Sequence, residues 1–453
     1  MNMKSIILIL ILLTSCDLFS QHKVQIIGTD DSVNEYSVEE ITDISFDLEY
    51  TTIAKVSYSD SMAEVRLNSD SDITFADKKI IFSGLNGIEE FALAEINSIE
   101  FEEEMLQNRY PFGELEVDEV IVDGLSNPWS LDFIDNDNII FTEKDGKLYR
   151  HSISNEQTTG ITGLPDVRPY GQGGLLDVTL HPNYDQNNMV YLAYTVSGNG
   201  GYTTAVGRGV LNGNMLENFE EIFRGSPLSE AGQHFGSRVV FDNENKVYFT
   251  IGDRGSQNTA QDSTMHNGGV LRINEDGSVP TDNPYLDAPG ALPEIYTMGN
   301  RNIQGMFYLS EKDEIWAIEH GPRGGDELNL IEAGENYAWP LATFGINYNG
   351  TPITEKTSIP GYKDPITYWV PSIAPCGMEL INYNEETDEM DILIATLAGS
   401  HLHRIIVKDY KVTQTVRSLE GYARFRDVQM SDDGYMYAAT QSPGRIVRLK
   451  MKD

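Results

Sequence analysis

Short runs of apolar residues, either alternating with polar ones or unbroken, recur along most of this chain. From about Leu115 onward they are NIIFTEKDG (138–146), MVYLAYT (189–195), KVYFTIGDRG (246–255), EIWAIEHG (314–321), DILIATLAG (391–399) and YMYAATQSPG (435–444). They are rich in β-branched and aromatic residues, and several follow turn segments such as IDNDN, DNEN and SDDG. Amphipathic helical periodicity is nearly absent. The pattern predicts six β-rich units of about 56 residues each.

A unit of this length fits one propeller blade, which consists of four antiparallel strands and their loops. We therefore expect an all-β fold, a six-bladed β-propeller of four-stranded blades over residues 115–453. An irregular pair of β-sandwiches is the alternative fold. Because the loops of a propeller converge at one face, the residues just after each repeated run are the first place to look for a site.

The chain before residue 105 has a different pattern. VQIIG, AKVSYS, AEVRLN and KKIIFSG predict short strands, and YSVEEITDISF (36–46) resembles FALAEINSIEF (91–101). We expect a small acidic β-rich module over residues 17–104 and a linker over 105–114. No group of residues in the module suggests chemistry.

The first 16 residues predict a lipoprotein signal peptide. A positive start precedes the apolar run IILILILL and then LTSC. The run is shorter than the roughly 20 residues that span a bilayer, and it has the length of a signal-peptide core. LTSC resembles a bacterial lipobox, in which cleavage leaves Cys16 as a lipid-bearing first residue. We expect export and lipid anchoring to a bacterial membrane, in the periplasm or at the cell surface; a plain secretory signal is the alternative.

Composition narrows the classes of partner. The chain has two cysteines, so a lipid on Cys16 leaves Cys376 without a disulfide partner, and we expect it to be a packed residue. The formal net charge is −38, and residues 17–108 hold 21 acidic against 5 basic residues. Such a surface argues against nucleic acid and anionic membrane faces as partners.

Candidate chemistry is densest between Gly299 and Pro340. Arg301 and Asn302 suit a planar anionic ligand, because arginine offers a bidentate charged fork and asparagine a donor and an acceptor. A Gly-Pro turn at Gly321 and Pro322, with carboxylates close behind, offers the oxygen ligands that Ca²⁺ prefers. A polar loop without a ligand is the alternative interpretation of this stretch.

Eight segments carry a family resemblance. They are GLSNPWSLDF, GQGGLLDVTLHPNY, HFGSRVVFDNENKVYFTIGDRG, AQDSTMHNGGVLRINEDGSVPTDNPY, GNRNIQG, EHGPRGGDELNLIEAGENYAWP, PSIAPCGM and RFRDVQMSDDGYMYAAT, in this order. Together they resemble the PQQ-dependent aldose sugar dehydrogenases, relatives of soluble quinoprotein glucose dehydrogenase. The resemblance covers about residues 115–450 and leaves out residues 21–108. It implies an enzyme that uses PQQ and Ca²⁺ to oxidise the anomeric hydroxyl of an aldose to a lactone. An external acceptor would then take the electrons.

The resemblance also implies roles for individual residues. His234, in AGQHFGSR, matches the catalytic base, which suits an imidazole that titrates near neutrality. Arg301 would also stabilise negative charge on the quinone. The positions that match cofactor contacts are Gln172, Arg301, Asn302, Arg424 and Arg426.

Two calcium sites are implied as well. The main-chain carbonyls of Gly321 and Pro322 match those that hold the catalytic Ca²⁺ beside PQQ. Glu327 and Tyr337, with Asp326, match a second, structural ion. A salt bridge from Glu327 to Arg323 is the alternative role for that carboxylate.

Several positions depart from glucose dehydrogenase. Ala398 stands where that enzyme has a lysine contacting the quinone, and Gln233 stands where it has an aspartate that could orient the base. Asn300 replaces a common histidine and Cys376 a common serine. The missing charge leaves a second function open, a non-catalytic surface propeller that binds carbohydrate or protein. A lactone-hydrolysing Ca²⁺ propeller is a third, and it would leave Arg424 and Arg426 without a purpose.

Overall fold

A computed structural model describes residues 110–452 in full and, before them, the backbone of ten strands between Ile7 and Glu104. The chain divides into two compact units, Met1–Pro111 and Phe112–Asp453. Each unit is described by itself.

The first unit is built from three antiparallel sheets, with strand orders β1-β2-β3, β10-β5-β6 and β4-β7-β8-β9. Their bounds are β1 (Ile7–Leu12), β2 (Lys23–Gly28), β3 (Val33–Ser37), β4 (Asp43–Ser45), β5 (Thr51–Tyr58), β6 (Ser61–Leu67), β7 (Asp72–Ala76), β8 (Lys79–Gly84), β9 (Gly87–Ala92) and β10 (Ile96–Glu104). A β-rich module before the propeller is therefore confirmed. Strand β1 lies in the apolar run of the predicted signal peptide, while Cys16 lies outside the described residues. The signal peptide, the lipid anchor and the predicted segment boundaries stay predictions.

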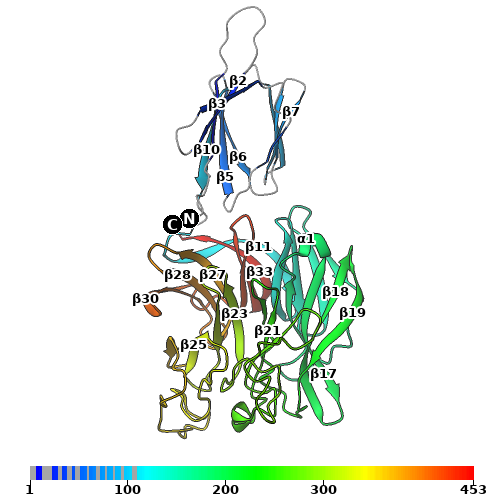
Figure 1. Cartoon of the computed structure of the whole chain (residues 1–453), viewed down its shortest axis with the longest axis vertical. Helices are drawn as coiled ribbons and strands as arrows, with labels where there is room; N and C mark the ends of the chain where they lie inside the picture. Colours follow the sequence, from blue (N-terminus) through cyan, green and yellow to red (C-terminus); the bar gives the residue numbers. More distant parts are fainter. Residues whose placement is uncertain are drawn as a thin grey trace, which may run out of the picture. The chain divides into compact units, whose positions relative to one another are not determined.

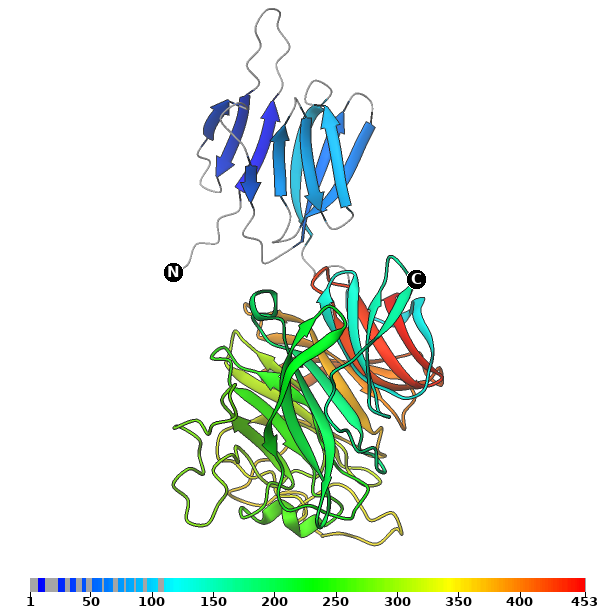
Figure 2. The ribbon, with the colours of Figure 1, turned by 90° about the vertical axis from the view of Figure 1, so that its right-hand side faces the viewer.

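The second unit is a ring of six sheets, which confirms the six-bladed propeller (Figures 1 and 2). The first three sheets consist of β12 (Pro128–Asp135), β13 (Asn138–Glu143), β14 (Lys147–Ser152) and β15 (Gln157–Ile161); β16 (Leu175–Leu180), β17 (Met189–Gly198), β18 (Gly201–Asn212) and β19 (Met215–Arg224); and β20 (Val239–Phe241), β21 (Val247–Ile251) and β22 (Gly269–Ile273). The next two consist of β23 (Ile303–Leu309), β24 (Glu314–Glu319), β25 (Asp326–Ile331) and β26 (Thr367–Trp369); and β27 (Pro375–Asn384), β28 (Glu389–Thr396), β29 (Leu402–Lys408) and β30 (Lys411–Ser418). The innermost strands β12, β16, β20, β23 and β27 pack side by side around the ring.

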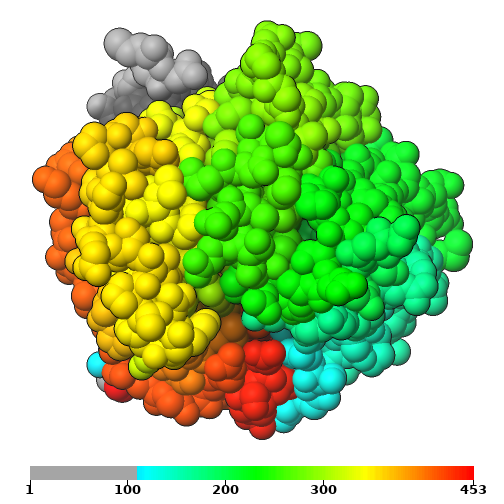
Figure 3. Space-filling model, turned by 90° about the horizontal axis from the view of Figure 1, so that it is seen from below, coloured from blue at the N-terminus to red at the C-terminus, as the bar shows by residue number. Residues whose placement is uncertain are grey.

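The sixth sheet closes the ring by joining the two ends of this unit. It has the order β11-β33-β32-β31 and combines β11 (Leu115–Leu125) with β31 (Arg424–Met430), β32 (Met436–Ser442) and β33 (Gly444–Met451). Its innermost strand, β31, packs against both β12 and β27. In the space-filling view the colour runs round the disc from cyan to red and returns to cyan (Figure 3). The ring is thus closed by backbone pairing rather than by a disulfide.

Every repeated run in the sequence forms the second strand of a sheet, namely β13, β17, β21, β24, β28 or β32. These strands are buried on both faces because each sheet packs between two neighbours; in β28 all residues after Glu389 are buried. Outermost strands such as β30 alternate between exposed and buried positions or are largely exposed. This difference explains why the repeat is most visible in the second strands.

The third sheet departs from the four-stranded pattern. It has three strands within the described residues, and an isolated bridge from Leu271 to Ile295 lies beyond β22. Helical structure in the propeller is confined to short segments such as α1 (Tyr184–Asn187) and η4 (Gln257–Gln261). Among the residues that the structure describes, no helix combines the length and hydrophobicity needed to cross a bilayer.

The antiparallel registers define one functional face of the ring. Each innermost strand begins on the side where the second strand of the same sheet ends. The pairs are Pro128 with Glu143, Leu175 with Tyr194, Val239 with Phe249, Ile303 with Glu319, Pro375 with Thr396 and Arg424 with Ser442. We call this side the site face. The residues before the innermost strands and after the second strands all lie on it.

Candidate active site

The structure brings most of the predicted site residues to the site face. Gln172 precedes β16, His234 precedes β20, and Arg301 and Asn302 directly precede β23. Gly321 and Pro322 follow β24, and Arg424 and Arg426 lie at the start of β31. The site is therefore assembled from four of the six sheets.

His234 is held in an unusual backbone conformation. It is buried and has φ of +56°, in the left-handed region that a residue with a side chain adopts only at a cost of about 1–3 kcal/mol. Its N–H donates to Oε1 of Gln172 at 2.9 Å. Gly252 makes the close approach possible, since a Cβ there would lie 2.5 Å from the His234 carbonyl oxygen. The loop is thus built around the position of this imidazole.

A carboxylate orients the imidazole. Nδ1 of His234 lies 2.5 Å from Oδ1 of Asp253, which also accepts the Gly255 N–H at 2.8 Å. The other oxygen accepts the indole N–H of Trp339 at 2.9 Å. Because three donors fix the carboxylate, Nδ1 of a neutral His234 carries the proton and Nε2 has the free lone pair. Gln233 stands where glucose dehydrogenase has an aspartate and cannot supply a charge, whereas Asp253 supplies one from another loop.

Electrostatics keep the imidazole neutral near pH 7. Burial is the main cause that lowers the pKa of His234, and the charge of Arg301 lowers it further, against the opposing effect of Asp253. For Asp253, burial acts to raise the pKa, but the hydrogen bond from His234 and the nearby positive charges outweigh it, so the pKa lies below its usual value. A neutral imidazole beside an ionised carboxylate is the state that a general base requires.

The Arg301-Asn302 pair is fixed by a buried glutamate at the end of β24. Oε2 of Glu319 accepts the N–H of Arg301 at 2.5 Å and that of Asn302 at 3.3 Å. Oε1 accepts the side-chain amide of Asn300 at 2.9 Å. Asn302 in turn accepts the Gly236 N–H at 3.1 Å, which ties the pair to the loop that carries His234.

The guanidinium of Arg301 lies against the turn predicted to hold calcium. Its Nη1 donates to the His320 carbonyl at 2.8 Å and to the Gly321 carbonyl at 3.3 Å. The same group lies 5.5 Å from the centroid of the Trp339 ring. One of the two carbonyls predicted to bind Ca²⁺ thus already accepts a hydrogen bond, although a carbonyl oxygen has a second lone pair.

Arg426 is a buried cation with an incomplete set of partners. It donates to Oε1 of Gln304 at 2.9 Å and lies 3.6 Å from the Cys376 sulfur, while its Nε has no hydrogen-bond partner. Arg424 is exposed and donates to the Leu397 carbonyl at 3.1 Å. The positive charge of Arg424 lowers the pKa of Arg426, in addition to the larger effect of burial. Two neighbouring cations with unused donors suit an anionic ligand.

Asp427 does not form the surface ion pair that Arg-x-Arg-Asp suggests. Its oxygens accept from Arg238, with the shorter contact at 2.8 Å, and Arg238 also binds Asp177 at 2.8 Å. This network ties three innermost strands together near the axis. The arginines at 424 and 426 are therefore not neutralised by the adjacent carboxylate.

Asp326 is a brace of the Gly321 turn. Its Oδ1 accepts the Gly321 N–H at 2.8 Å and the Ser372 hydroxyl at 2.9 Å. Its Oδ2 accepts the N–H groups of Ile373 at 2.6 Å and Ala374 at 3.0 Å. Four donors occupy this carboxylate, so the geometry does not favour the predicted role of Asp326 as a metal ligand.

Glu327 is in a different situation. It lies directly opposite Glu319 in the β24–β25 register, and burial followed by the charge of Glu319 raises its pKa well above the usual value. Oδ1 of the neighbouring Asn329 is buried without a partner. The Tyr337 hydroxyl donates to the Leu330 carbonyl at 2.5 Å and accepts the Glu332 N–H, so only its main-chain carbonyl could serve as the predicted ligand. Between residues 110 and 452, no cluster of three or more His, Cys, Asp or Glu side chains has metal-binding geometry.

Two site residues found in the structure were absent from the sequence-based set. Asp253 lies near the end of the repeated run KVYFTIGDRG (246–255), two residues after β21, where the propeller pattern directs attention, and could have been found by that rule. Glu319 ends the run EIWAIEHG but reads there as a strand residue. Its role depends on four backbone and side-chain donors that the sequence does not display.

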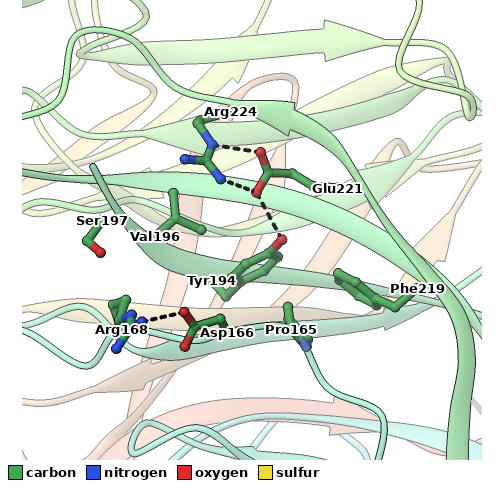
Figure 4. A pocket seen from close by; sticks show the side chains of 9 residues that line it. All are labelled: Pro165, Asp166, Arg168, Tyr194, Val196, Ser197, Phe219, Glu221 and Arg224. Atoms are coloured by element: carbon green, nitrogen blue, oxygen red, sulfur yellow. Dashed lines mark hydrogen bonds and ion pairs between the residues drawn. The ribbon is translucent and has the colours of Figure 1, made fainter. Parts of the chain in front are cut away.

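A separate hollow lies on the second sheet, away from these residues (Figure 4). Its charged groups satisfy one another: Arg224 donates to Glu221 at 2.7 and 2.8 Å, and Arg168 pairs with Asp166. The Tyr194 hydroxyl lies 3.3 Å from Glu221. No predicted site residue lines this hollow.

Comparisons with known proteins agree with the geometry. A sequence model described as Glucose / Sorbosone dehydrogenase matches residues 125–448. The aldose sugar dehydrogenase YliI of Escherichia coli K12 is 37% identical over 344 residues, covering 74% of this chain and 93% of that protein. The apo-form of the soluble aldose sugar dehydrogenase from Escherichia coli has a TM-score of 0.70 at 34% identity, covering 75% of this chain and 100% of that structure. The PQQ-bound aldose sugar dehydrogenase from Streptomyces coelicolor has a TM-score of 0.63 at 26% identity, covering 74% and 97%.

Proposed function

The chain belongs to the glucose/sorbosone dehydrogenase family, and from this premise we propose that it oxidises the anomeric hydroxyl of aldoses to lactones with PQQ and Ca²⁺. Electrons would pass to an external acceptor. The observation that carries the proposal is the His234–Asp253 pair, because a binding protein has no need of a neutral imidazole oriented by a buried carboxylate.

The donor set fits a planar polycarboxylate quinone. Arg424 and Arg426 lack a neighbouring carboxylate to neutralise them, and the buried Nε of Arg426 has no partner in the folded protein. Arg301 and Asn302 provide a charged fork and an amide from another sheet on the site face. With Gln172, these residues would hold PQQ. The PQQ-bound relative from Streptomyces coelicolor supports this choice of cofactor.

The oxygen set fits calcium. The Gly321 and Pro322 carbonyls would hold the catalytic ion beside the quinone, and Asp326 fixes the turn through the Gly321 N–H. For the second ion, the buried carboxylate of Glu327 and the unpartnered Oδ1 of Asn329 are available, whereas Asp326 and the facing Glu319 each already accept four hydrogen bonds. A cation there would relieve the repulsion that raises the pKa of Glu327.

The protein residues supply the acid–base part of the reaction. Nε2 of His234 would accept the proton of the anomeric hydroxyl while Nδ1–H stays on Asp253, whose charge stabilises the imidazolium. The Arg301 guanidinium would stabilise negative charge that develops near the Gly321 turn. When bound, PQQ accepts the hydride of the sugar and Ca²⁺ polarises the quinone carbonyl.

Reconstitution tests the proposal. Purified protein with PQQ and Ca²⁺ should reduce an artificial dye when aldoses are added, and a calcium chelator should abolish the reaction until Ca²⁺ is restored. Absence of both PQQ binding and dye reduction across a sugar panel would refute it.

The alternative is a non-catalytic propeller that binds carbohydrate or protein, and His234→Gln separates it from an enzyme. In an enzyme the variant should lose at least a hundredfold in turnover and keep PQQ binding, since the imidazole moves a proton. In a binding protein the affinity would be unchanged and there would be no turnover to lose.

We also propose export and lipid anchoring through Cys16, which the sequence of the first 16 residues supports. Cells grown with a fatty-acid analogue should label the wild-type protein and not Cys16→Ser. Equal labelling of both would refute the anchor.

A further inference from the structure

We propose that Lys144 binds the cofactor and supplies the positive charge that Ala398 does not. The inference rests on the proposed function, because the ligand it concerns is the anionic quinone. It adds a residue that the family resemblance did not carry over.

Like other site residues, Lys144 lies just after the second strand of its blade. It directly follows β13 on the site face, as His320 follows β24 and as Asp253 lies two residues after β21. Ala398 has the corresponding place, two residues after β28. Lys144 and Ala398 thus both lie within two residues of the end of the second strand of their blades, on the site face.

The two positions flank the arginine pair. Strand β31 packs between β12 and β27, the innermost strands of the blades that carry Lys144 and Ala398. On the Ala398 side, Arg424 donates to the Leu397 carbonyl at 3.1 Å. On the other side, the charge of Arg426 acts on Lys144. A cation lost on one side of the pair is therefore matched by a cation present on the other.

The side chain of Lys144 is directed toward the predicted cofactor contacts. Its ammonium group donates to the Gly171 carbonyl at 2.8 Å, and Gly171 directly precedes Gln172. Gly174 lets the strands approach, because a Cβ there would lie 1.9 Å from the Lys144 carbonyl oxygen. Gln172 in turn accepts the N–H of His234. Lys144 is thus linked through one loop to the base.

The charge of Lys144 is not neutralised by the protein. Within residues 110–452 no carboxylate forms an ion pair with it, whereas the neighbouring Lys147 pairs with Asp145 at 2.6 Å and with Glu143 at 3.7 Å. Burial lowers the pKa of Lys144, and the charge of Arg426 lowers it further. Two cations held near each other without a carboxylate are stabilised by an anionic ligand, and the quinone has three carboxylates.

The alternative is that Lys144 only braces the Gly171 loop. A brace and a ligand contact differ in their dependence on salt, because a charge that meets the anion directly contributes to the salt sensitivity of binding. The conservative variant Lys144→Arg keeps the charge, whereas Lys144→Gln removes the charge and keeps a polar side chain that can donate a hydrogen bond.

The test is a titration of PQQ into calcium-loaded apoprotein, followed by the absorbance of the bound quinone at low and high NaCl. Lys144→Gln should raise the Kd about tenfold and weaken its dependence on salt, as expected for one charge-assisted hydrogen bond. Lys144→Arg should stay within about threefold of wild type. Lys147→Gln, on the same hairpin, is the matched control and should bind as wild type. Thermal melting of each variant checks that the fold is intact.

A second variant tests whether PQQ affinity can be restored. Adding Ala398→Lys to Lys144→Gln should restore most of the affinity, since it returns a cation to the other side of the arginine pair. A wild-type Kd for Lys144→Gln would overturn the inference, as would a raised Kd with an unchanged salt dependence. If the wild-type protein itself binds no PQQ, the proposed function fails instead, so the two failures are distinguishable.

Discussion

Replacing Asp253 by Asn is the sharpest test of the acid–base arrangement. All three groups that contact this carboxylate are donors: the His234 Nδ1–H and the Gly255 N–H on Oδ1, and the Trp339 indole N–H on Oδ2. An asparagine can present only one acceptor oxygen. Its NH₂ group must therefore face either the indole of Trp339 or the imidazole of His234.

Both orientations harm the base. With the amide oxygen toward His234, the charge that stabilises the imidazolium is gone and the Trp339 N–H faces another donor. With the NH₂ group toward His234, Nδ1 must become an acceptor and the proton moves to Nε2, the atom that should receive the substrate proton. A positioned general base contributes about 10²–10⁴ in rate, so we expect kcat to fall about a hundredfold or more.

The pH profile adds a signature that a merely structural defect would not give. Asp253 acts to raise the pKa of His234, so its removal should lower that pKa. The acid limb of kcat/KM should therefore move to lower pH while the plateau falls. The assay is dye reduction from pH 4 to 9 with saturating PQQ and Ca²⁺, with PQQ affinity measured separately.

Asp262→Asn is the matched control, since this aspartate lies outside the His234–Asp253 pair and, among the described residues, its carboxylate accepts hydrogen bonds only from Thr264. It should keep the wild-type rate and profile. Full activity of Asp253→Asn with an unmoved acid limb would show that Asp253 neither selects the tautomer nor stabilises the imidazolium.

Three further predictions concern the surroundings of the site. Glu319→Gln should lower the free energy of unfolding by about 2 kcal/mol in urea denaturation, because the new NH₂ faces backbone or side-chain donors; wild-type stability would contradict this. Gly377→Ala should cost about 1–3 kcal/mol, because its Cβ would lie 1.9 Å from Oδ1 of Asp427, whereas Gly160→Ala, where the nearest atom is 4.0 Å away, should have a much smaller effect. In a Cys16→Ser protein at pH 8, Cys376 should react with a thiol reagent only after denaturation, because burial raises its pKa to about 11; rapid reaction of the folded protein would refute this.

The fold could be predicted because the second strand of every blade has the same apolar sequence pattern. A second strand such as β28 is buried on both faces, so it reads as a continuous apolar run that repeats once per blade. Outer strands such as β30 carry no such signal. The third sheet departs from the four-stranded pattern: only β20, β21 and β22 pair regularly, and beyond them one bridge at Ile295 takes the place of a strand.

The site residues that could be predicted are those whose type itself indicates a chemical role. His234 and Arg301 do so, and the structure brings both to the site face. Asp253 lies where the propeller pattern directs attention, but its residue type alone does not mark it, because an aspartate in a turn reads as a turn residue until the imidazole 19 positions earlier is found at 2.5 Å. Asp326 shows the reverse case: a carboxylate beside a Gly-Pro turn suggests a metal ligand, and in the structure its two oxygens accept from four protein donors. For both aspartates, the role follows from the hydrogen-bond partners that the folded structure brings to the carboxylate.

The overall charge of the chain is the least informative guide to its ligand. A net charge of −38 predicts repulsion of a trianionic cofactor, yet the site face gathers Lys144, Arg301, Arg424 and Arg426. At physiological ionic strength charges are screened over about 8 Å, so distant surface carboxylates contribute little at the site. Two carboxylates close to these cations already accept hydrogen bonds: Asp427 accepts from Arg238, and Glu319 accepts from backbone N–H groups. Lys144 is therefore one of the local charges that an anionic ligand would meet at the site, and its loss should weaken the binding of that ligand.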